Sequence, residues 1–189
     1  AKQKIFFHEQ CAFNIHDTMI YQKENPPPTG GENRYYQEFE YMLVFSKGKT
    51  KIFKAIEQKR RNKHKDKRTE RVKGFTRSQD GTFIKKLVPL NQTTKVGNIW
   101  MLTVGGGNVT DDEIAYGHPA IFPEQLAADH IYSWSNENDL VYDPFMGSGT
   151  VAKMAHLQKR NWIGSEISQE YFDLANKRIK PYLQQLTAF

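Results

Sequence analysis

The glycine-rich stretch at residues 143–150, Asp-Pro-Phe-Met-Gly-Ser-Gly-Thr, constrains the fold of this chain more than any other part of it. Leu140-Val141-Tyr142 precedes it and predicts a short buried strand, and apolar residues recur at helical spacing from Val151 to Ala155. Gly147 and Gly149 can adopt positive φ and have no side chain, so the backbone there can approach a ligand closely. The N–H groups of the following helix favour an anion. This strand, turn and helix predict a small-molecule site that accepts a carboxylate or a phosphate.

An acidic residue follows at the distance that a nucleoside site requires. Asn161 to Ser165 predicts a second short strand, whose C-terminal end should lie beside the first. Glu166 comes directly after it and is 19 residues beyond Gly147. In nucleoside-binding α/β units, an acid about 20 residues past the glycines accepts hydrogen bonds from sugar hydroxyls. The spacing predicts that Glu166 binds a ribose.

Two kinds of enzyme share this arrangement. Gly147-x-Gly149-x-x-Ala152 satisfies the dinucleotide fingerprint, which is compatible with a nicotinamide-dependent enzyme. Only 39 residues follow Thr150, however, and these cannot supply the two mononucleotide-binding halves of a dinucleotide fold. Residues 143–150, together with 161–167 (Asn-Trp-Ile-Gly-Ser-Glu-Ile), closely resemble the cofactor motif of DNA amino methyltransferases that use S-adenosyl-L-methionine. The resemblance implies an α/β, Rossmann-like methyltransferase fold.

Composition indicates a globular chain without disulfides or membrane spans. The 189 residues are 38% hydrophobic, Cys11 is the single cysteine, and no apolar run approaches the roughly 20 residues that span a bilayer. We therefore expect a cytoplasmic protein. His8 and Cys11 lack further ligands at suitable spacing, so no metal is predicted. Ala1 is compatible with a trimmed initiator or with a chain that begins in mid-protein.

The net charge of +6 hides a strongly basic stretch. Residues 47–73 hold 13 Lys or Arg against three acids, a local balance of +10, and the rest of the chain is −4. A basic block of this kind indicates either a solvated surface or a polyanionic partner. Beside the methyltransferase motif, we predict that it binds DNA. The candidate DNA-binding residues are Lys59, Arg60, Arg61, Lys63, Lys65, Lys67 and Arg68.

The resemblance also divides the chain. Residues 17–23 and 39–46 are β-branched and aromatic runs that predict an antiparallel pair, so residues 1–46 would be part of the methyltransferase sheet. Residues 47–98 would be an inserted target-recognition region, and 99–189 the cofactor-binding part. Ile99–Leu102 predicts a strand, and a helix should begin near Pro123 and present Leu126 to Trp134 on one face.

The resemblance assigns cofactor contacts residue by residue. The string His118-Pro119-Ala120-Ile121-Phe122-Pro123 is similar to a family motif that lines the methionine end of the pocket. Tyr171 would either stack near the adenine or pack in the core. A helix capped by Ser168 should follow, with Phe172, Ala175, Ile179 and Leu183 facing the core. The expected cofactor-binding residues are His118, Ala120, Phe122, Asp143, Phe145, Gly147, Ser148, Gly149, Thr150, Glu166, Ile167 and Tyr171.

The family's catalytic tetrad (Asp, Asn or Ser, then Pro-Pro-aromatic) is missing from this chain. Asn25-Pro26-Pro27-Pro28 ends in proline instead of an aromatic residue and is interpreted as a turn. The motif order resembles the permuted class, in which the tetrad lies upstream, so we expect the N-terminal catalytic strands to be absent. That would leave residues 140–142 as an exposed edge that can pair with another chain.

The function implied is methyl transfer to the N6 of adenine or the N4 of cytosine in DNA, with RNA as another possible substrate. A flipped base would expose its exocyclic amine to the cofactor's methyl group. The alternatives are a cofactor- and DNA-binding subunit without activity and, with less support, a nicotinamide-dependent enzyme. In the first alternative a second chain or an upstream segment supplies the tetrad. The sequence specifies neither the base nor the recognition site.

Overall fold

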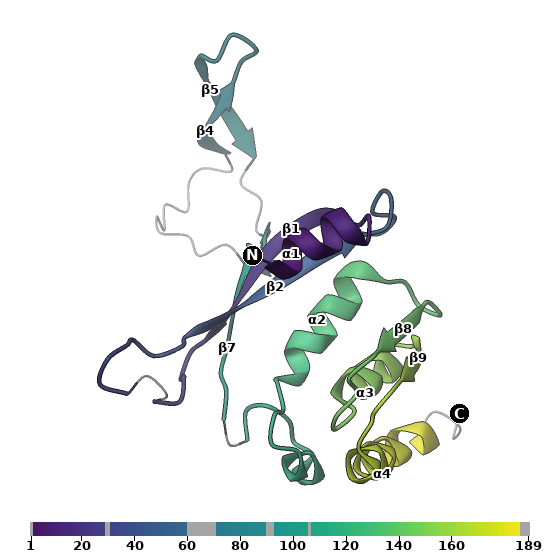
Figure 1. Ribbon diagram of the computed structural model, residues 1–189. Helices are drawn as coiled ribbons and strands as arrows, with labels where there is room; N and C mark the ends of the chain where they lie inside the picture. Colours follow the sequence, from purple (N-terminus) through teal and green to yellow (C-terminus); the bar gives the residue numbers. More distant parts are fainter. Residues whose placement is uncertain (1, 29–30, 60–70, 90–92, 106, 186–189) are drawn as a thin grey trace. The chain divides into compact units, whose positions relative to one another are not determined.

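The computed structural model describes residues 2–28, 31–59, 71–89, 93–105 and 107–185 (Figure 1). The chain divides into two compact units. Residues 55–96 form the smaller unit, and residues 1–54 together with 97–189 form the larger one. Within the described ranges, no helix is long and apolar enough to cross a membrane.

The larger unit contains a three-stranded sheet with the strand order β2-β1-β7. Its strands are β1 (Asn14–Lys23), β2 (Phe39–Ser46) and β7 (Ile99–Leu102). The predicted pair is confirmed, because β1 and β2 run antiparallel, with Met19 opposite Met42. β7 is parallel to β1 on its other side and places Trp100 opposite Tyr21. Met19, Tyr21 and Trp100 are buried, so the side chains of these residues belong to the core of the larger unit.

Two short helical turns precede β1. They are α1 (Lys2–Ile5) and the π-helical turn η1 (Phe6–Gln10). The Phe7 ring lies 5.1 Å from that of Phe45 in β2 and 6.2 Å from that of Phe13. These aromatic contacts hold the N-terminal turns against the end of the hairpin.

A second, two-stranded sheet in the same unit holds the glycine turn. It consists of β8 (Leu140–Asp143) and β9 (Asn161–Gly164), which are parallel and pair Asp143 with Gly164. α3 (Thr150–Leu157) connects the two strands. The remaining helical elements are the 3-10 turn η2 (Glu113–Gly117), α2 (Glu124–Trp134) and α4 (Gln169–Gln185). The predicted strand, turn, helix and strand are therefore confirmed.

The core of this region consists of two small apolar clusters. One contains Ala127 and Ile131 of α2 with Met154 and Ala155 of α3. The other joins Met146 and Ala152 to Ala175 and Ile179 of α4. The helix predicted near Pro123 is confirmed, with Pro123 as its N-cap instead of a residue of its first turn.

Two burial predictions are wrong. Leu140 and Tyr142 are 67% and 59% exposed, because β8 has only β9 beside it within the described residues. β8 is thus not a buried strand but an exposed apolar edge, as the resemblance to the permuted class implies for residues 140–142. On α4, Phe172 and Leu183 are 44% and 42% exposed, whereas the side chain of Arg178 is inside. The core-facing side of α4 is therefore partly ionic.

The smaller unit consists of two antiparallel pairs. β3 (Glu57–Lys59) pairs with β6 (Thr93–Lys95), and β4 (Arg71–Arg77) pairs with β5 (Phe83–Pro89). Of the candidate DNA-binding residues, Lys59 lies in β3 and is exposed. The other six, Arg60, Arg61, Lys63, Lys65, Lys67 and Arg68, lie outside the described residues.

Candidate cofactor-binding site

The glycine turn after β8 has the backbone that its sequence predicts. Gly147 and Gly149 have φ values of 51° and 80°, in the left-handed region that glycine favours. A Cβ atom on Gly149 would lie 3.0 Å from Ile179 Cδ1 and 3.2 Å from Ala175 Cβ. Glycine at this position therefore allows α4 to pack directly against the turn.

Glu166 connects the end of β9 to this turn. Its Oε2 accepts a 2.8 Å hydrogen bond from the N–H of Gly147, and its Oε1 accepts a 3.0 Å bond from the N–H of Ser168. These bonds, with that from Ser168 the larger influence, lower the pKa of Glu166, so the carboxylate is charged at neutral pH. Each carboxylate oxygen has a second lone pair, which leaves Glu166 able to accept hydroxyl donors of a ligand.

His118 and Tyr171 form the wall next to Gly147. Their ring centroids are 4.3 Å apart in an edge-to-face arrangement. The N–H of Ala120 donates to His118 Nδ1 at 3.1 Å, which fixes the imidazole ring. A Cβ on Gly147 would lie 3.2 Å from His118 Nε2, so the ring lies directly against the turn. The structure thus brings together four of the predicted site residues: His118, Gly147, Glu166 and Tyr171.

Large apolar side chains near these residues in the sequence are exposed. Phe145 is 87% exposed and Ile167 is fully exposed, and they flank the glycine turn and Glu166 in sequence. Phe122, at 36% exposure, lies with Ala120 on the wall of a hollow of about 610 Å³ that Tyr21 and Val104 also line. Exposed apolar groups beside a charged acceptor are suited to a ligand that has both a flat apolar ring and hydroxyl groups.

Two predicted residues, Ser148 and Thr150, are turned away from solvent, and a third, Asp143, is half-buried. Ser148 and Thr150 are 5% and 4% exposed, and both hydroxyls accept hydrogen bonds from Arg178. Asp143 Oδ1 accepts from the N–H of Phe145 at 3.0 Å, while burial, helped by the charge of Glu166, raises its pKa. These side chains support the turn from within, and the direct ligand contacts predicted for them would come from their backbone groups.

Sequence patterns did not predict a buried ionic cluster that lies behind the turn. It consists of Asp112 beside η2, Glu124 at the start of α2, Lys153 of α3 and Arg178 of α4. One signal was present: an arginine at position 178 interrupts the apolar face that contains Ala175 and Ile179. Within the described residues, no group of His, Cys, Asp or Glu could hold a metal ion.

The side chain of Asn25 is bonded to the segment that follows β7. Its Nδ2 donates to the carbonyl of Val104, and its Oδ1 accepts a 2.7 Å hydrogen bond from the N–H of Val104. Both ends of the amide are thus bonded to the chain after β7. The residue ties the hairpin turn to β7, in agreement with its interpretation as part of a turn.

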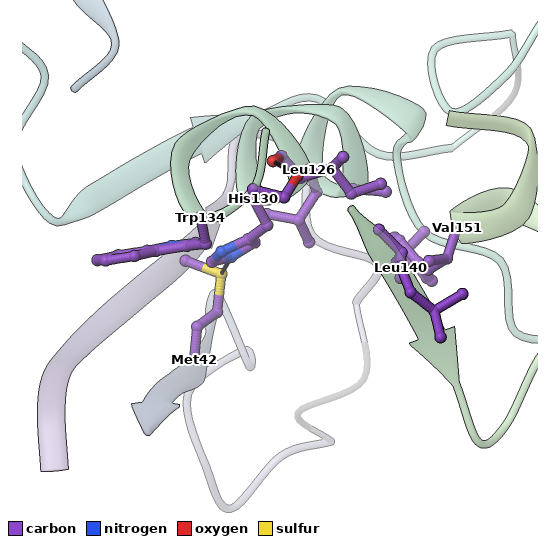
Figure 2. A pocket seen from close by; sticks show the side chains of 11 residues that line it. Met42, Leu126, His130, Trp134, Leu140 and Val151 are labelled. Carbon is purple, nitrogen blue, oxygen red and sulfur yellow. Dashed lines mark hydrogen bonds between the residues drawn. The ribbon is translucent and has the colours of Figure 1, made fainter. Parts of the chain in front are cut away.

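An apolar groove lies between β2 and β8. Its volume is about 520 Å³, and one face of α2 forms its floor (Figure 2). Met42 of β2 contributes one wall, where its Sδ is 3.1 Å from His130 Nε2, and Leu140 and Val151 contribute the other. The α2 face is the one that the sequence predicts, with Leu126, Ala127, His130, Ile131 and Trp134.

Parallel strands joined through a glycine turn, with an acid at the end of the second strand, define an α/β protein with a nucleoside-type cofactor site. The family model for DNA methylases matches residues 2–177, so the chain belongs to the DNA methylase family. The predicted family is confirmed.

Individual relatives of the chain are named as methyltransferases. The chain is 48% identical over 184 residues to the orphan methyltransferase M.BamHII of Bacillus amyloliquefaciens, in an alignment covering 96% of this chain and 68% of that protein. It is 33% identical over 178 residues to the type II methyltransferase M.HinfI of Haemophilus influenzae, covering 93% of this chain and 42% of that protein. The chain thus spans only part of the length of either relative.

Solved structures have the same fold. The complex of M1.HpyAVI with S-adenosylmethionine superposes with a TM-score of 0.60 at 24% identity, covering 94% of this chain and 68% of that one. The cytosine-N4-specific PvuII DNA methyltransferase gives a TM-score of 0.60 at 18% identity, covering 94% and 55%. These likenesses confirm the predicted α/β methyltransferase fold.

Proposed function

We propose that this chain provides the cofactor-binding part of a DNA methyltransferase. The methyl group would pass from S-adenosyl-L-methionine to the exocyclic amine of adenine (N6) or cytosine (N4) in DNA. One observation carries the proposal: Glu166 is bonded to the N–H of Gly147 beside the His118–Tyr171 pair. Membership of the DNA methylase family and the M1.HpyAVI complex with S-adenosylmethionine support it.

The residues present fit this cofactor. Glu166 has free lone pairs for the two ribose hydroxyls, and the exposed side chains of Phe145 and Ile167 offer apolar surface for the adenine ring. Glycine at positions 147 and 149 supports the proposal, because a backbone without side chains can approach a ligand closely. When bound, S-adenosylmethionine supplies an electrophilic methyl group on a sulfonium sulfur, which the lone pair of a base amine can accept. This chain binds and orients that donor.

The group that positions the amine comes from elsewhere. An Asp-, Asn- or Ser-Pro-Pro-aromatic tetrad does not occur in the 189 residues, and Asn25 is bonded at both ends of its amide to Val104. We propose that a further segment, upstream in a longer chain or in a partner chain, supplies the tetrad. Its polar side chain and proline carbonyl would accept hydrogen bonds from the amine, and its aromatic ring would stack on the flipped base.

The groove between β2 and β8 supports this proposal. Within the described residues no ladder joins the two sheets of the larger unit, and β8 exposes Leu140 and Tyr142. The indole N–H of Trp134, which also lines the groove, is buried without a hydrogen-bond partner in the described part of the chain. An incoming strand would cover the apolar side chains, pair with the free edge of β8 and offer carbonyl acceptors.

Calorimetric titration tests the cofactor assignment. The purified chain should bind S-adenosylmethionine and S-adenosylhomocysteine and should not bind NAD. NAD is the appropriate comparison ligand, because a dinucleotide site would use the same glycine turn at Gly147 and the same acid, Glu166. Binding of NAD alone would overturn the proposal in favour of a nicotinamide-dependent enzyme.

A methyl-transfer assay tests the need for a second segment. With labelled S-adenosylmethionine and DNA of mixed sequence, the chain alone should give little or no transfer. Co-expression with a segment that has the tetrad should restore it, and the same segment with its Pro-Pro-aromatic residues replaced by alanine is the control. Turnover by the chain alone would overturn this part of the proposal. Cofactor and DNA binding without restored transfer would favour the alternative, a binding subunit without activity.

A further inference from the structure

The side chain of Arg178 is fully buried and reaches three parts of the chain. Its Nε donates to Asp112 Oδ2 at 2.8 Å, and one terminal nitrogen donates to Glu124 Oε1 at 2.6 Å and to Thr110 Oγ1 at 3.1 Å. The other terminal nitrogen donates to the glycine turn. It contacts the carbonyl of Ser148 at 3.0 Å, the hydroxyl of Ser148 at 3.1 Å and the hydroxyl of Thr150 at 3.0 Å.

The bond to the Ser148 carbonyl fixes the peptide group between Ser148 and Gly149. A peptide group is planar, so holding its oxygen also sets the direction of its N–H. Two residues earlier, the N–H of Gly147 donates a hydrogen bond to Glu166. The glycine turn is therefore held by a carboxylate at one peptide group and by a guanidinium two residues later.

The same arginine holds the segment that contains His118. Thr110, Asp112 and Glu124, its other partners, lie before and after the stretch from His118 to Phe122. His118 in turn lies against Gly147 and Tyr171. Arg178 thus sets the relative position of two walls of the cofactor site without lining that site itself.

Lys153 provides a direct comparison within the same cluster. Its Nζ donates to Asp112 Oδ2 and to Glu124 Oε1, each at 2.7 Å, and it lies 4.6 Å from the centre of the Tyr182 ring. It is 4% exposed, so it is as buried as Arg178. Its side chain has the same two carboxylate partners as Arg178, but the structure records no side-chain bond from it to the glycine turn.

We propose that Arg178 is a positioning residue for the cofactor site, and that Lys153 supports only the stability of the same ionic cluster. The inference rests on the proposed function, because the ligand that reports on the site is S-adenosylmethionine. Removing either cation leaves two partly buried carboxylates with a single cation, so both variants should lose stability. Only loss of Arg178 should free the glycine turn.

The experiment compares Arg178→Met with Lys153→Met in the full chain. Both melting temperatures should fall. Arg178→Met should weaken binding of S-adenosylmethionine by at least about tenfold, since the charge-assisted hydrogen bonds from this terminal nitrogen to the turn are removed. Lys153→Met should change it by less than about threefold. Arg178→Lys, which keeps the charge but not the planar fork, should recover part of the melting temperature and little of the affinity.

Hydrogen exchange of the ligand-free chain provides a second readout that does not depend on the cofactor. Amides in residues 147–151 should exchange faster in Arg178→Met than in Lys153→Met. If both variants lose protection and affinity in proportion to their melting temperatures, Arg178 is only structural and the proposal is wrong. If the wild-type chain fails to bind S-adenosylmethionine, the proposed function is wrong, and the exchange comparison still decides the role of Arg178.

Thr150→Val keeps the test decisive if Arg178→Met does not fold. The substitution removes one acceptor of Arg178 on the turn side and leaves all four charged groups in place. It should weaken binding of S-adenosylmethionine by roughly two- to tenfold, the effect of removing one hydrogen bond. Wild-type affinity and wild-type exchange at residues 147–151 in this variant would overturn the proposal.

Discussion

The N–H of Gly147 donates to Glu166 Oε2 at 2.8 Å, although the two residues belong to different strand ends. The acid therefore holds the turn after β8 in place, a role that the sequence motif does not reveal. Its remaining lone pairs are the acceptors that we propose for the ribose hydroxyls.

Replacing Glu166 with alanine should weaken binding of S-adenosylmethionine by at least about tenfold. The ribose hydroxyls would lose their charged hydrogen-bond acceptor. Calorimetric titration measures the change, and Glu170→Ala, at an exposed acid of α4, is the matched control. Unchanged affinity in a folded Glu166→Ala variant would remove Glu166 from the site.

Replacing Gly149 with alanine should destabilise the chain more than replacing Gly48. Both glycines have φ of 80°, so both substitutions incur the cost of a left-handed alanine, about 1 to 2 kcal/mol. A Cβ at Gly48 meets nothing within 4 Å, whereas one at Gly149 meets Ile179 and Ala175. The crowding should add about 1 to 3 kcal/mol, measured by urea unfolding. Equal losses would show that α4 shifts without cost.

Asp112 should make stability depend on pH in the acid range. Burial raises the pKa of this carboxyl, but hydrogen bonds from Lys153, Tyr182 and Arg178 outweigh that influence and lower the pKa from 3.8 to about 2. Because the folded pKa is depressed, the stabilisation is complete above about pH 4 and is lost as the pH falls towards 2.

Urea unfolding of Asp112→Asn between pH 5 and pH 2 measures this contribution. The variant should be less stable than the wild type by roughly 3 kcal/mol near pH 5, since two buried cations lose a charged partner. The difference should shrink below pH 4, by no more than about 1.4 kcal/mol per pH unit for one proton. Asp111→Asn, at the exposed neighbouring residue, is the control and should change stability by less than about 0.5 kcal/mol. A constant difference at all pH values would contradict the assignment.

The basic stretch should provide DNA affinity that does not depend on sequence. Changing Arg60, Arg61 and Lys63 to glutamine should flatten the plot of log affinity against log salt by about 0.9 for each phosphate that the variant no longer neutralises. Fluorescence anisotropy with labelled duplexes measures the slope.

A matched variant removes three exposed lysines elsewhere, Lys2, Lys177 and Lys180, and should leave the slope unchanged. If the slope of the first variant stays constant while affinity for one sequence collapses, these residues read bases instead of phosphates.

Features that depend on neighbouring residues in the chain could be predicted. Glycines at 147 and 149 require a turn, apolar spacing after Thr150 requires a helix, and strand runs of the right composition flank them. Glu166 could be identified because its spacing from the glycines can be counted along the sequence.

Features that depend on distant partners could not be predicted. The buried position of Arg178 follows from Asp112 and Glu124, which are more than 50 residues away. The apolar run of β8 by itself wrongly indicated that Leu140 is buried, and only the family resemblance, with its missing upstream strands, indicated an exposed edge. Long-range pairing of polar groups and sheet order leave no periodic signal in the chain.

The pairing of β3 with β6 has a consequence for protein engineering. Glu57 lies opposite Lys95 and Lys59 opposite Thr93, so the chain enters and leaves the smaller unit through adjacent strands. A segment whose two ends are already held together can change in length with a small entropic cost, about 0.6 kcal/mol for each doubling. Residues 60–92 can therefore be exchanged as a cassette, and a library of foreign loops grafted between Lys59 and Thr93 could be screened for new DNA preferences on one unaltered scaffold.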